Sequence, residues 1–343
     1  MRRRITPFRI VACLILALVV TVVILMRIPS GDYLLLPDVA HPVAPLVRVT
    51  GGKPAKGGGE LYFVDVQEQQ ASEFDKLFQG LIHPHSTSLP ASVLIPPCTS
   101  NGEFIQSELR QMSQSQRIAA AVAERQLGYV VKQRNIGVQV DNVYGDVPAA
   151  CKIAPGDVIT AINGKPTKTN TDLQAAMSTV KPGQTIDVEI RRGNSTIHES
   201  VKTVADPHNP TRPLIGIFVE PAVEISKLPV KVSIDSGQIG GPSAGLAFTL
   251  ELMRKLGRDV THGYRVAATG EIALNGDVLP IGGVEQKTYG VRQAGAQVFL
   301  VPARGGNAAT AKKYAGPDLK IIPVTSLKQA LRALTRLPKL PNE

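Results

Sequence analysis

The chain has 343 residues, 43% of them hydrophobic, which is enough for two or three domains with apolar cores. Its formal charge is +10, but five of its 38 basic residues flank one apolar segment, which leaves 33 against 28 acidic residues. It lacks tryptophan, a basic stripe interleaved with aromatics and any nucleic-acid-binding motif, so we expect no nucleic-acid partner.

The first predicted element is an uncharged apolar segment from Ile10 to Met26. As a helix it would span about 26 Å, close to the ~30 Å of a bilayer core. The arginines before it predict a cytoplasmic N-terminus over residues 1–9 and a transmembrane signal anchor over residues 10–27. A cleaved signal peptide is the alternative, although its apolar region would usually be shorter. We therefore expect a single-pass protein of the cell membrane whose remaining residues are extracytoplasmic.

Residues 28–128 are predicted to form an extended start, a hairpin and a long helix. Leu46–Val49 and Leu61–Val64 flank a Gly- and Lys-rich turn, which favours a β-hairpin. A polar helix is expected from Glu103 to Leu127, because Gly128 then ends it.

The cysteines follow no metal-binding pattern. Cys13 lies in the apolar segment. Cys98 and Cys151 would lie in an oxidising compartment, where a disulfide between them is one option. We predict no metal site and no cofactor.

Residues 129–204 combine short strands, tight turns and one helix. A strand is predicted at Gly137–Val140, and the run Ala150–Ile159 leads to Ala161–Gly164, which together are predicted to form a strand into a tight turn. A helix is predicted from the spacing of Leu173, Ala176, Met177 and Val180. A strand is predicted from the alternation of Ile186, Val188 and Ile190, and a Gly-Asn turn follows it.

This order of elements resembles a bacterial PDZ domain, and the Pro-Gly-Asp-Val-Ile … Ile-Asn-Gly pattern is its most specific part. PDZ domains hold peptides by strand addition at a sheet edge, often with capture of a C-terminal carboxylate. The resemblance implies that Ile136, Gly137 and Val138 supply the backbone amides for this. An apolar-Gly-apolar triplet is common in any strand, and a spacer role for the whole unit also stays open.

The region 211–343 contains a serine and a lysine in distinctive surroundings. Ser243 lies in Gly-Gly-Pro-Ser-Ala-Gly, and Lys287 ends Pro-Ile-Gly-Gly-Val-Glu-Gln-Lys. A serine hydroxyl needs a base, and a lysine can be that base only when burial or charge lowers its pKa from about 10.4. A helix is predicted to start at the serine, which would add positive potential where an oxyanion forms. A Gly-Pro-Ser-Ala-Gly stretch alone is also typical of a turn and helix cap.

The sequence around the pair favours catalysis, because it is similar to the proteolytic domain of Lon proteases in the order and spacing of its motifs. The resemblance runs from about Pro229 to Leu337 and includes Thr269–Ile272, Gly276–Gly283 and Val298–Pro302.

By position, the resemblance makes Ser243 the nucleophile and Lys287 the general base, and it implies that Thr269 supports the lysine. Gly241 and Ala244 are the supporting positions beside the serine, where backbone N–H groups would stabilise the oxyanion. Many Lon proteases carry an acidic residue three places before the serine, where this chain has Gly240. A carboxylate that tunes the dyad is therefore not evident from the sequence.

No Gly-x-x-x-x-Gly-Lys-[Ser/Thr] motif occurs, so we expect no ATP-driven unfoldase in this chain. The predicted fold is mixed α+β and α/β: one N-terminal transmembrane helix, a small β-rich PDZ domain and a Lon-type proteolytic domain. If the early hairpin belongs to the protease, the PDZ unit is inserted into it.

The predicted function is that of a membrane-anchored, ATP-independent serine endopeptidase with a Ser-Lys dyad. Its partners would be protein or peptide substrates, including chains with exposed C-terminal tails, and the membrane, and an oligomer is compatible with the sequence. A catalytically silent, PDZ-bearing membrane scaffold or adaptor is the alternative.

Overall fold

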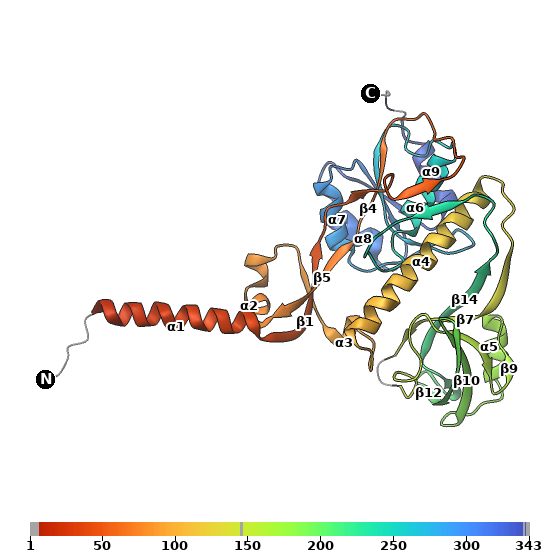
Figure 1. Cartoon of the computed structure of the whole chain (residues 1–343), viewed down its shortest axis with the longest axis horizontal. Coiled ribbons are helices and arrows are strands. Elements are labelled where there is room, and N and C mark those ends of the chain that lie inside the picture. Colours follow the sequence, from red (N-terminus) through yellow and green to blue (C-terminus); the bar gives the residue numbers. More distant parts are fainter. Residues whose placement is uncertain (1–6, 145–146, 339, 341–343) are drawn as a thin grey trace.

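The computed structural model describes residues 7–144, 147–338 and 340. Helix α1 (Pro7–Arg27) projects alone from one side of the molecule (Figure 1). Its stretch Ile10–Arg27 is long and apolar enough to cross a membrane, and none of it is buried in the rest of the chain. The predicted N-terminal apolar helix is therefore present.

A small antiparallel sheet follows α1 directly, in the order β5-β1-β6. Its elements are β1 (Pro29–Pro37), β5 (Val66–Ser72), β6 (Thr87–Pro90), and the short helices α2 (Glu73–Ile82) and α3 (Ala91–Leu94). Helix α2 begins in a capping box, in which Ser72 and Asp75 bond to each other's backbone N–H groups. This sheet lies between α1 and the rest of the molecule (Figure 1).

Helix α4 (Asn101–Gln126) matches the helix expected from Glu103 to Leu127. Gly128 follows it with a φ of +92°, a conformation that glycine adopts at low cost. The helix is not polar on all sides. Its buried residues Ala119, Ala120, Val122 and Ala123 belong to the same core cluster as the buried residues of α6 (Gly245–Lys255). Figure 1 shows α4 running from the small sheet toward the upper unit, alongside the strands of the lower unit.

The lower unit in Figure 1 is a sheet with strand order β11-β10-β8-β7-β14, with β9 paired to β8. Its elements are β7 (Gln133–Val143), β8 (Val158–Ile162), β9 (Lys165–Pro166), α5 (Asn170–Met177), β10 (Thr185–Arg192), β11 (Ser195–Lys202) and β14 (Ile217–Ile225), with a separate hairpin of β12 (Val204–Asp206) and β13 (Asn209–Leu214). The predicted strands, helix and β10–β11 turn are all confirmed. Strand β14, however, falls within the range 211–343 that we assigned to the proteolytic part.

The upper unit is built on a five-stranded sheet with the order β2-β4-β16-β19-β20. The sheet consists of β2 (His41–Pro42), β4 (Glu60–Phe63), β16 (Arg265–Ala268), β19 (Val298–Pro302) and β20 (Lys320–Val324), and its helices are α6, α7 (Val284–Gln293), α8 (Asn307–Tyr314) and α9 (Leu327–Thr335). Two small pairs add β3 (Val47–Val49) with β15 (Val232–Ile234), and β17 (Glu271–Ile272) with β18 (Val278–Leu279). Ser326 caps α9, because its side chain accepts a hydrogen bond from the Gln329 N–H.

The predicted hairpin between Leu46–Val49 and Leu61–Val64 is wrong. Both stretches form strands, but β3 pairs with β15 and β4 pairs in parallel with β16. Residues 61–64 are all buried, which is typical of an inner strand of a parallel sheet rather than of one arm of a hairpin. Because residues 61–64 are buried on both faces, β4 pairs with β16, which is distant in sequence, and not with the nearby β3.

Residues before and after the lower unit share one core. Val47 and Phe63 pack in the same cluster as Leu246 and Val266. The lower unit is thus inserted between two parts of the chain that fold together. A disulfide between Cys98 and Cys151 connects the segment before α4 to this inserted unit.

Candidate active site

Ser243 and Lys287 meet at the start of two helices. Ser243 lies two residues before α6, and Lys287 lies in the first turn of α7 with only 3% of its surface exposed. The Lys287 Nζ donates a hydrogen bond of 2.7 Å to the Ser243 Oγ. The two side chains that the sequence singled out, 44 positions apart, are therefore in direct contact.

Burial lowers the pKa of Lys287 to about 8. The carboxylates of Asp65 and Glu68 act in the opposite direction, because a nearby negative charge favours the protonated amine. At neutral pH a sizeable minority of the amines would be neutral and able to accept a proton from the serine hydroxyl.

The segment after β16 fixes the backbone of Ser243. The Thr269 hydroxyl and the Gly270 N–H both donate to the Ser243 carbonyl, at 3.3 and 2.8 Å. Thr269 is fully buried. We expected this threonine to support the lysine, whereas the hydrogen bond that the structure gives its hydroxyl positions the serine.

Helix α4 holds the other side of the serine loop (residues 235–244). The Gly241 N–H donates to the Glu108 carbonyl at 3.0 Å, and the Ser115 hydroxyl donates to the Pro242 carbonyl at 3.0 Å. A Cβ on Gly240 would lie 2.7 Å from the Cβ of Glu108, so position 240 has no room for a side chain. In place of an acidic residue at position 240, the carboxyl group beside this loop is that of Glu108 on α4. Burial raises the pKa of Glu108 to about 7.

The N–H groups beside the serine differ in availability. That of Gly241 is engaged by Glu108, so Gly241 contributes its left-handed backbone, with φ +77°, rather than a free donor. Ala244 caps α6, and none of the hydrogen bonds in the described part of the chain uses its N–H. Of the two supporting positions that the sequence named, Ala244 has the donor free for an oxyanion.

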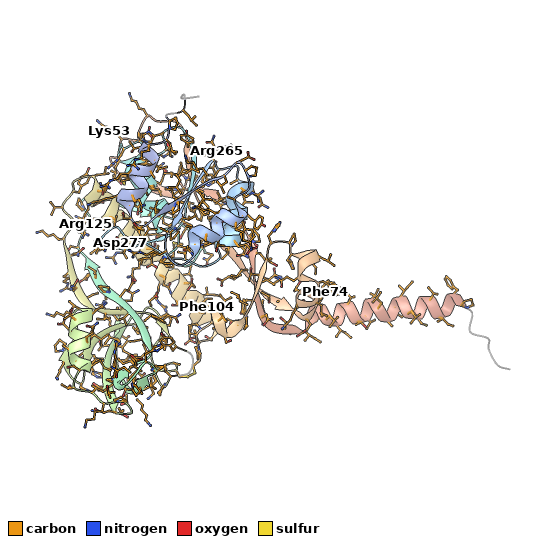
Figure 2. The ribbon with its side chains drawn as sticks, turned by 180° about the vertical axis from the view of Figure 1, so that it is seen from behind. Lys53, Phe74, Phe104, Arg125, Arg265 and Asp277 are labelled. Carbon is orange, nitrogen blue, oxygen red and sulfur yellow. A yellow bond between two sulfur atoms is a disulfide. The ribbon has the colours of Figure 1, made fainter. Side chains whose placement is uncertain are left out.

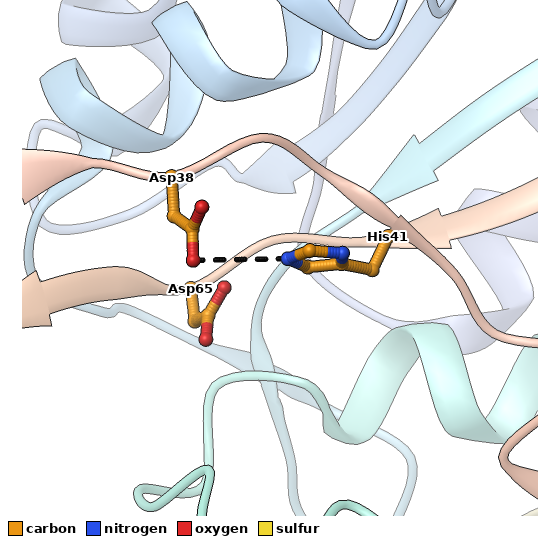
Figure 3. A group of neighbouring side chains, drawn as sticks. All are labelled: Asp38, His41 and Asp65. Carbon is orange, nitrogen blue, oxygen red and sulfur yellow. Dashed lines mark ion pairs between the residues drawn. The ribbon is translucent and has the colours of Figure 1, made fainter.

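A second group of polar side chains comes from the start of β2 and from the segments before β2 and before β5. Figure 3 shows the His41 ring directed at Asp38, with Asp65 beside them. Each could offer one ligand atom, and these atoms lie within 4.8 Å of one another. Burial raises the pKa of Asp65, and the charge on Lys287 partly offsets this. The group could accommodate a divalent cation, while the expectation that no metal takes part stays a prediction.

The sequence missed Asp65, Glu108 and Ser115 as neighbours of the site. Asp65 follows the apolar run of β4, and side chains at strand ends often line sites, so this position carried a weak signal. Glu108 and Ser115 lie on a helix far away in sequence. Only the packing of α4 against α6 brings them to the serine loop.

The triplet Ile136–Val138 lies in the middle of β7. Gly137 and Val138 lie opposite Ala222 and Pro221 of β14, and Val138 also pairs with Ile159 of β8. Both sides of this part of β7 are therefore occupied by the protein's own strands. A role of the triplet in peptide binding stays a prediction.

A cleft of about 960 Å³ lies between the inserted unit and α4. Its lining includes Glu108 and Gln111 of α4, and Asp141 and Arg192 of the β-rich unit. Glu108 also lies against Gly240 of the serine loop, while neither Ser243 nor Lys287 lines the cleft.

Comparison with protein families separates two units along the chain, although the second match begins inside β14 and leaves out β2 and β4 of the upper sheet. The PDZ domain family matches residues 125–203, and the Lon protease (S16) C-terminal proteolytic domain matches residues 220–336. The chain contains a PDZ domain and a Lon-type proteolytic domain. The Lon-type match includes both Ser243 and Lys287 with α6, α7 and β16, while α4 lies outside it.

Curated relatives match the Lon-type domain over a limited length. The chain is 38% identical over 104 residues to the Lon protease of Chloroflexus aggregans, and 37% identical over 108 residues to Lon protease 2 of Thermus thermophilus. These alignments cover 29% and 31% of this chain, but 12% of each relative. The chain thus spans a small part of the length of the relatives that it matches.

Two solved structures resemble the PDZ domain. The PDZ domain of the SdrC-like protein from Listeria monocytogenes is 32% identical, and its alignment covers 24% of this chain and 87% of that chain, with a TM-score of 0.23. Its counterpart from Listeria innocua is 34% identical over 24% of this chain and 93% of that chain, also with a TM-score of 0.23.

Proposed function

We propose that this protein is a membrane-anchored, ATP-independent serine endopeptidase in which Ser243 and Lys287 form the catalytic dyad. The observation that carries the proposal is the 2.7 Å hydrogen bond between the Lys287 Nζ and the Ser243 Oγ inside a buried site. The match to a Lon-type proteolytic domain supports the same reaction class.

The chemistry requires the neutral form of Lys287. Its Nζ accepts the hydroxyl proton while the Ser243 Oγ attacks the scissile carbonyl, and the resulting oxyanion lies near the Ala244 N–H at the start of α6. The protonated amine then gives this proton to the leaving nitrogen, and the C–N bond breaks to leave an acyl-enzyme. Water, deprotonated by the same amine, hydrolyses the ester and restores the serine.

The membrane anchor would be α1, with the N-terminus in the cytoplasm and both domains outside. The Cys98–Cys151 disulfide supports this placement, because disulfides persist in oxidising compartments. Protease treatment of cells after the outer barrier is opened should digest the two domains and leave α1 in the membrane. A mature N-terminus near Gly31 would instead indicate cleavage and release.

The PDZ domain would recruit protein substrates, or gate their access, through the cleft beside α4. Strand addition at the Ile136–Val138 stretch requires β14 to leave β7, since β14 fills that edge. Peptide binding would therefore compete with a strand of the same chain that continues into the serine loop.

The role of the PDZ domain can be separated from the chemistry by deletion. The Ser226 N–H donates to the Lys132 carbonyl at 3.0 Å, so removal of residues 133–225 joins two ends that are already adjacent. With Cys98→Ser to remove the unpaired thiol, this variant should still cut short peptides but cut protein substrates with exposed tails more slowly. Unchanged cleavage of proteins would exclude recruitment by this domain.

The decisive test of the activity is digestion of casein and of a short peptide by the full-length protein in vesicles, compared with Ser243→Ala. Cleavage that is lost in the folded variant supports the proposal. Cleavage by neither protein would favour the alternative, a PDZ-bearing membrane scaffold whose protease fold is silent.

A further inference from the structure

Helix α2 exposes its apolar face. Leu81 is 85% exposed and Leu77 is 64% exposed, while Phe78 and Ile82 are 41% and 42% exposed. No residue of α2 is buried. A surface helix normally turns this face toward the core of its own protein, so the arrangement in α2 is inverted.

The polar side of α2 makes the contacts with the rest of the chain. The Lys76 Nζ lies 2.8 Å from Asp32 of β1, and Gln79 Nε2 donates to the Ser86 carbonyl at 3.0 Å. The Asp75 carboxylate lies 3.1 Å from the ring of His83. The Lys76–Asp32 ion pair joins α2 to the small sheet, and the other two contacts join it to the segment that follows it. On the apolar side Phe78 packs against Phe74 of the same helix, with ring centroids 4.8 Å apart, while Leu77 and Leu81 stay exposed.

Helix α2 begins where α1 ends. The Glu73 N–H donates to the carbonyl of Ile28 at 2.9 Å, and Ile28 is the residue directly after α1. Figure 1 shows α2 beside this end of α1, on the side away from the PDZ domain. Figure 2, from the opposite side, places Phe74 at the same junction. If α1 crosses a membrane, α2 lies at the boundary between lipid and water.

We propose that α2 is an interfacial helix that inserts Leu77, Phe78, Leu81 and Ile82 into the outer edge of the lipid bilayer. This inference rests on the proposed anchoring by α1. A lipid surface fits better than a second copy of the chain, because the apolar face is continuous with the end of the membrane-spanning helix. Amphipathic helices in this position bury their apolar side about 5–10 Å into the headgroup and acyl boundary.

The position of α2 has a consequence for the active site. Strand β5 runs directly into α2, and it carries Glu68, while Asp65 precedes it. Both carboxylates act on Lys287. Attachment through α1 and α2 together would thus hold the face of the protease that contains this strand at a constant height and orientation above the membrane, which one flexible tether could not do.

The absence of tryptophan from the chain permits a direct test. Leu81→Trp, in the full-length protein reconstituted into phosphatidylcholine–phosphatidylglycerol vesicles, places the only tryptophan of the chain on the apolar face. Val130→Trp is the matched control, because Val130 is an apolar residue 80% exposed between α4 and β7. Leu77→Trp repeats the measurement on the same face of α2, should the first variant fold poorly.

The emission of Leu81→Trp should shift to shorter wavelength in vesicles and fall about twofold when the lipids are brominated near the headgroup end of their chains, because the helix lies only ~5–10 Å deep. Val130→Trp should show neither effect. Emission of both α2 variants that matches the control, in protein that floats with the vesicles, overturns the proposal but leaves the α1 anchor intact. A blue shift without bromine quenching indicates a second copy and also overturns it. Protein that does not float overturns the anchor, and this inference with it.

Discussion

The Gly241 N–H donates to the backbone carbonyl of Glu108, so the loop that carries Ser243 is attached to α4. The same helix contacts the PDZ domain, since the Gln114 side chain donates to Gln139 of β7 at 2.7 Å. One helix therefore determines the position of the nucleophile and of the inserted domain. A change in the packing of α4 would affect both.

We expect Gly240→Ala to lower kcat/KM by about tenfold or more, since overpacking against a rigid neighbour costs roughly 1–3 kcal/mol. The added Cβ would lie 2.7 Å from the Cβ of Glu108, and either α4 or the serine loop must move. Gly102→Ala is the control, because a Cβ there meets nothing within 4 Å. Glu108→Gly in the Gly240→Ala background should recover part of the loss. A Gly240→Ala enzyme with wild-type kinetics would show that the loop tolerates the displacement.

Ser243→Ala and Lys287→Ala should each lower the rate of peptide cleavage by at least about a thousandfold, because the nucleophile and its base act as one unit and neither works without the other. For the same reason the double variant should be little slower than either single one. Circular dichroism and thermal unfolding would verify that each protein is folded. Independent, multiplicative losses would contradict a dyad.

The pH dependence of kcat/KM should follow the titration of Lys287. Its pKa near 8 lies below the ordinary value, so the neutral, catalytically competent amine accumulates as pH rises. We expect kcat/KM to increase about tenfold per pH unit well below 8 and to level off above it. Glu108 titrates nearby with a pKa near 7, and Glu108→Gln should therefore retain the limb near 8. A flat profile between pH 6 and 9 would rule out Lys287 as the base.

Removal of the lysine charge should stabilise the fold at neutral pH. Because the pKa of Lys287 is lower in the folded protein than in the unfolded chain, the unfolded chain binds more protons between pH 8 and 10.5. Below pH 8 the buried amine lowers the free energy of unfolding by on the order of 3 kcal/mol. This loss becomes smaller as pH rises from 8 toward 10.5. Lys287→Met should accordingly raise Tm at pH 6.5, with a gain that shrinks toward pH 10. An equal gain at both pH values would point to packing alone.

The sequence predicted what depends on local pattern and failed where distant packing decides. The long helix that ends before Gly128 follows from local pattern alone, and the structure confirms it. Ser243 and Lys287 were found because motifs surround them. Glu108 could not be found, because no local pattern indicates that a helix residue will occupy the space beside Gly240. The pairing of residues 61–64 was wrong for a similar reason, since its partner β16 lies about 200 residues away.

Strand β14 also escaped prediction, and it leads to the last testable expectation. Ala222 of β14 is 1% exposed where it lies opposite Gly137. A buried, unpaired charge is strongly unfavourable, so Ala222→Glu should displace β14 from β7. Phe218→Glu is the matched control on the same strand, because Phe218 is 49% exposed and its replacement should leave the pairing intact.

If β14 competes with peptides for β7, the Ala222→Glu protein should bind a labelled peptide with a free C-terminal carboxylate more tightly than the wild type. The gain should be about tenfold or more, because apparent affinity scales with the fraction of molecules whose site is open. Fluorescence anisotropy would measure the binding, and an amidated peptide would show whether the carboxylate is required. Hydrogen exchange over residues 217–225 would verify that β14 has left the sheet. Unchanged affinity in a protein whose β14 exchanges freely would mean that this edge of β7 is not where the PDZ domain takes its peptides.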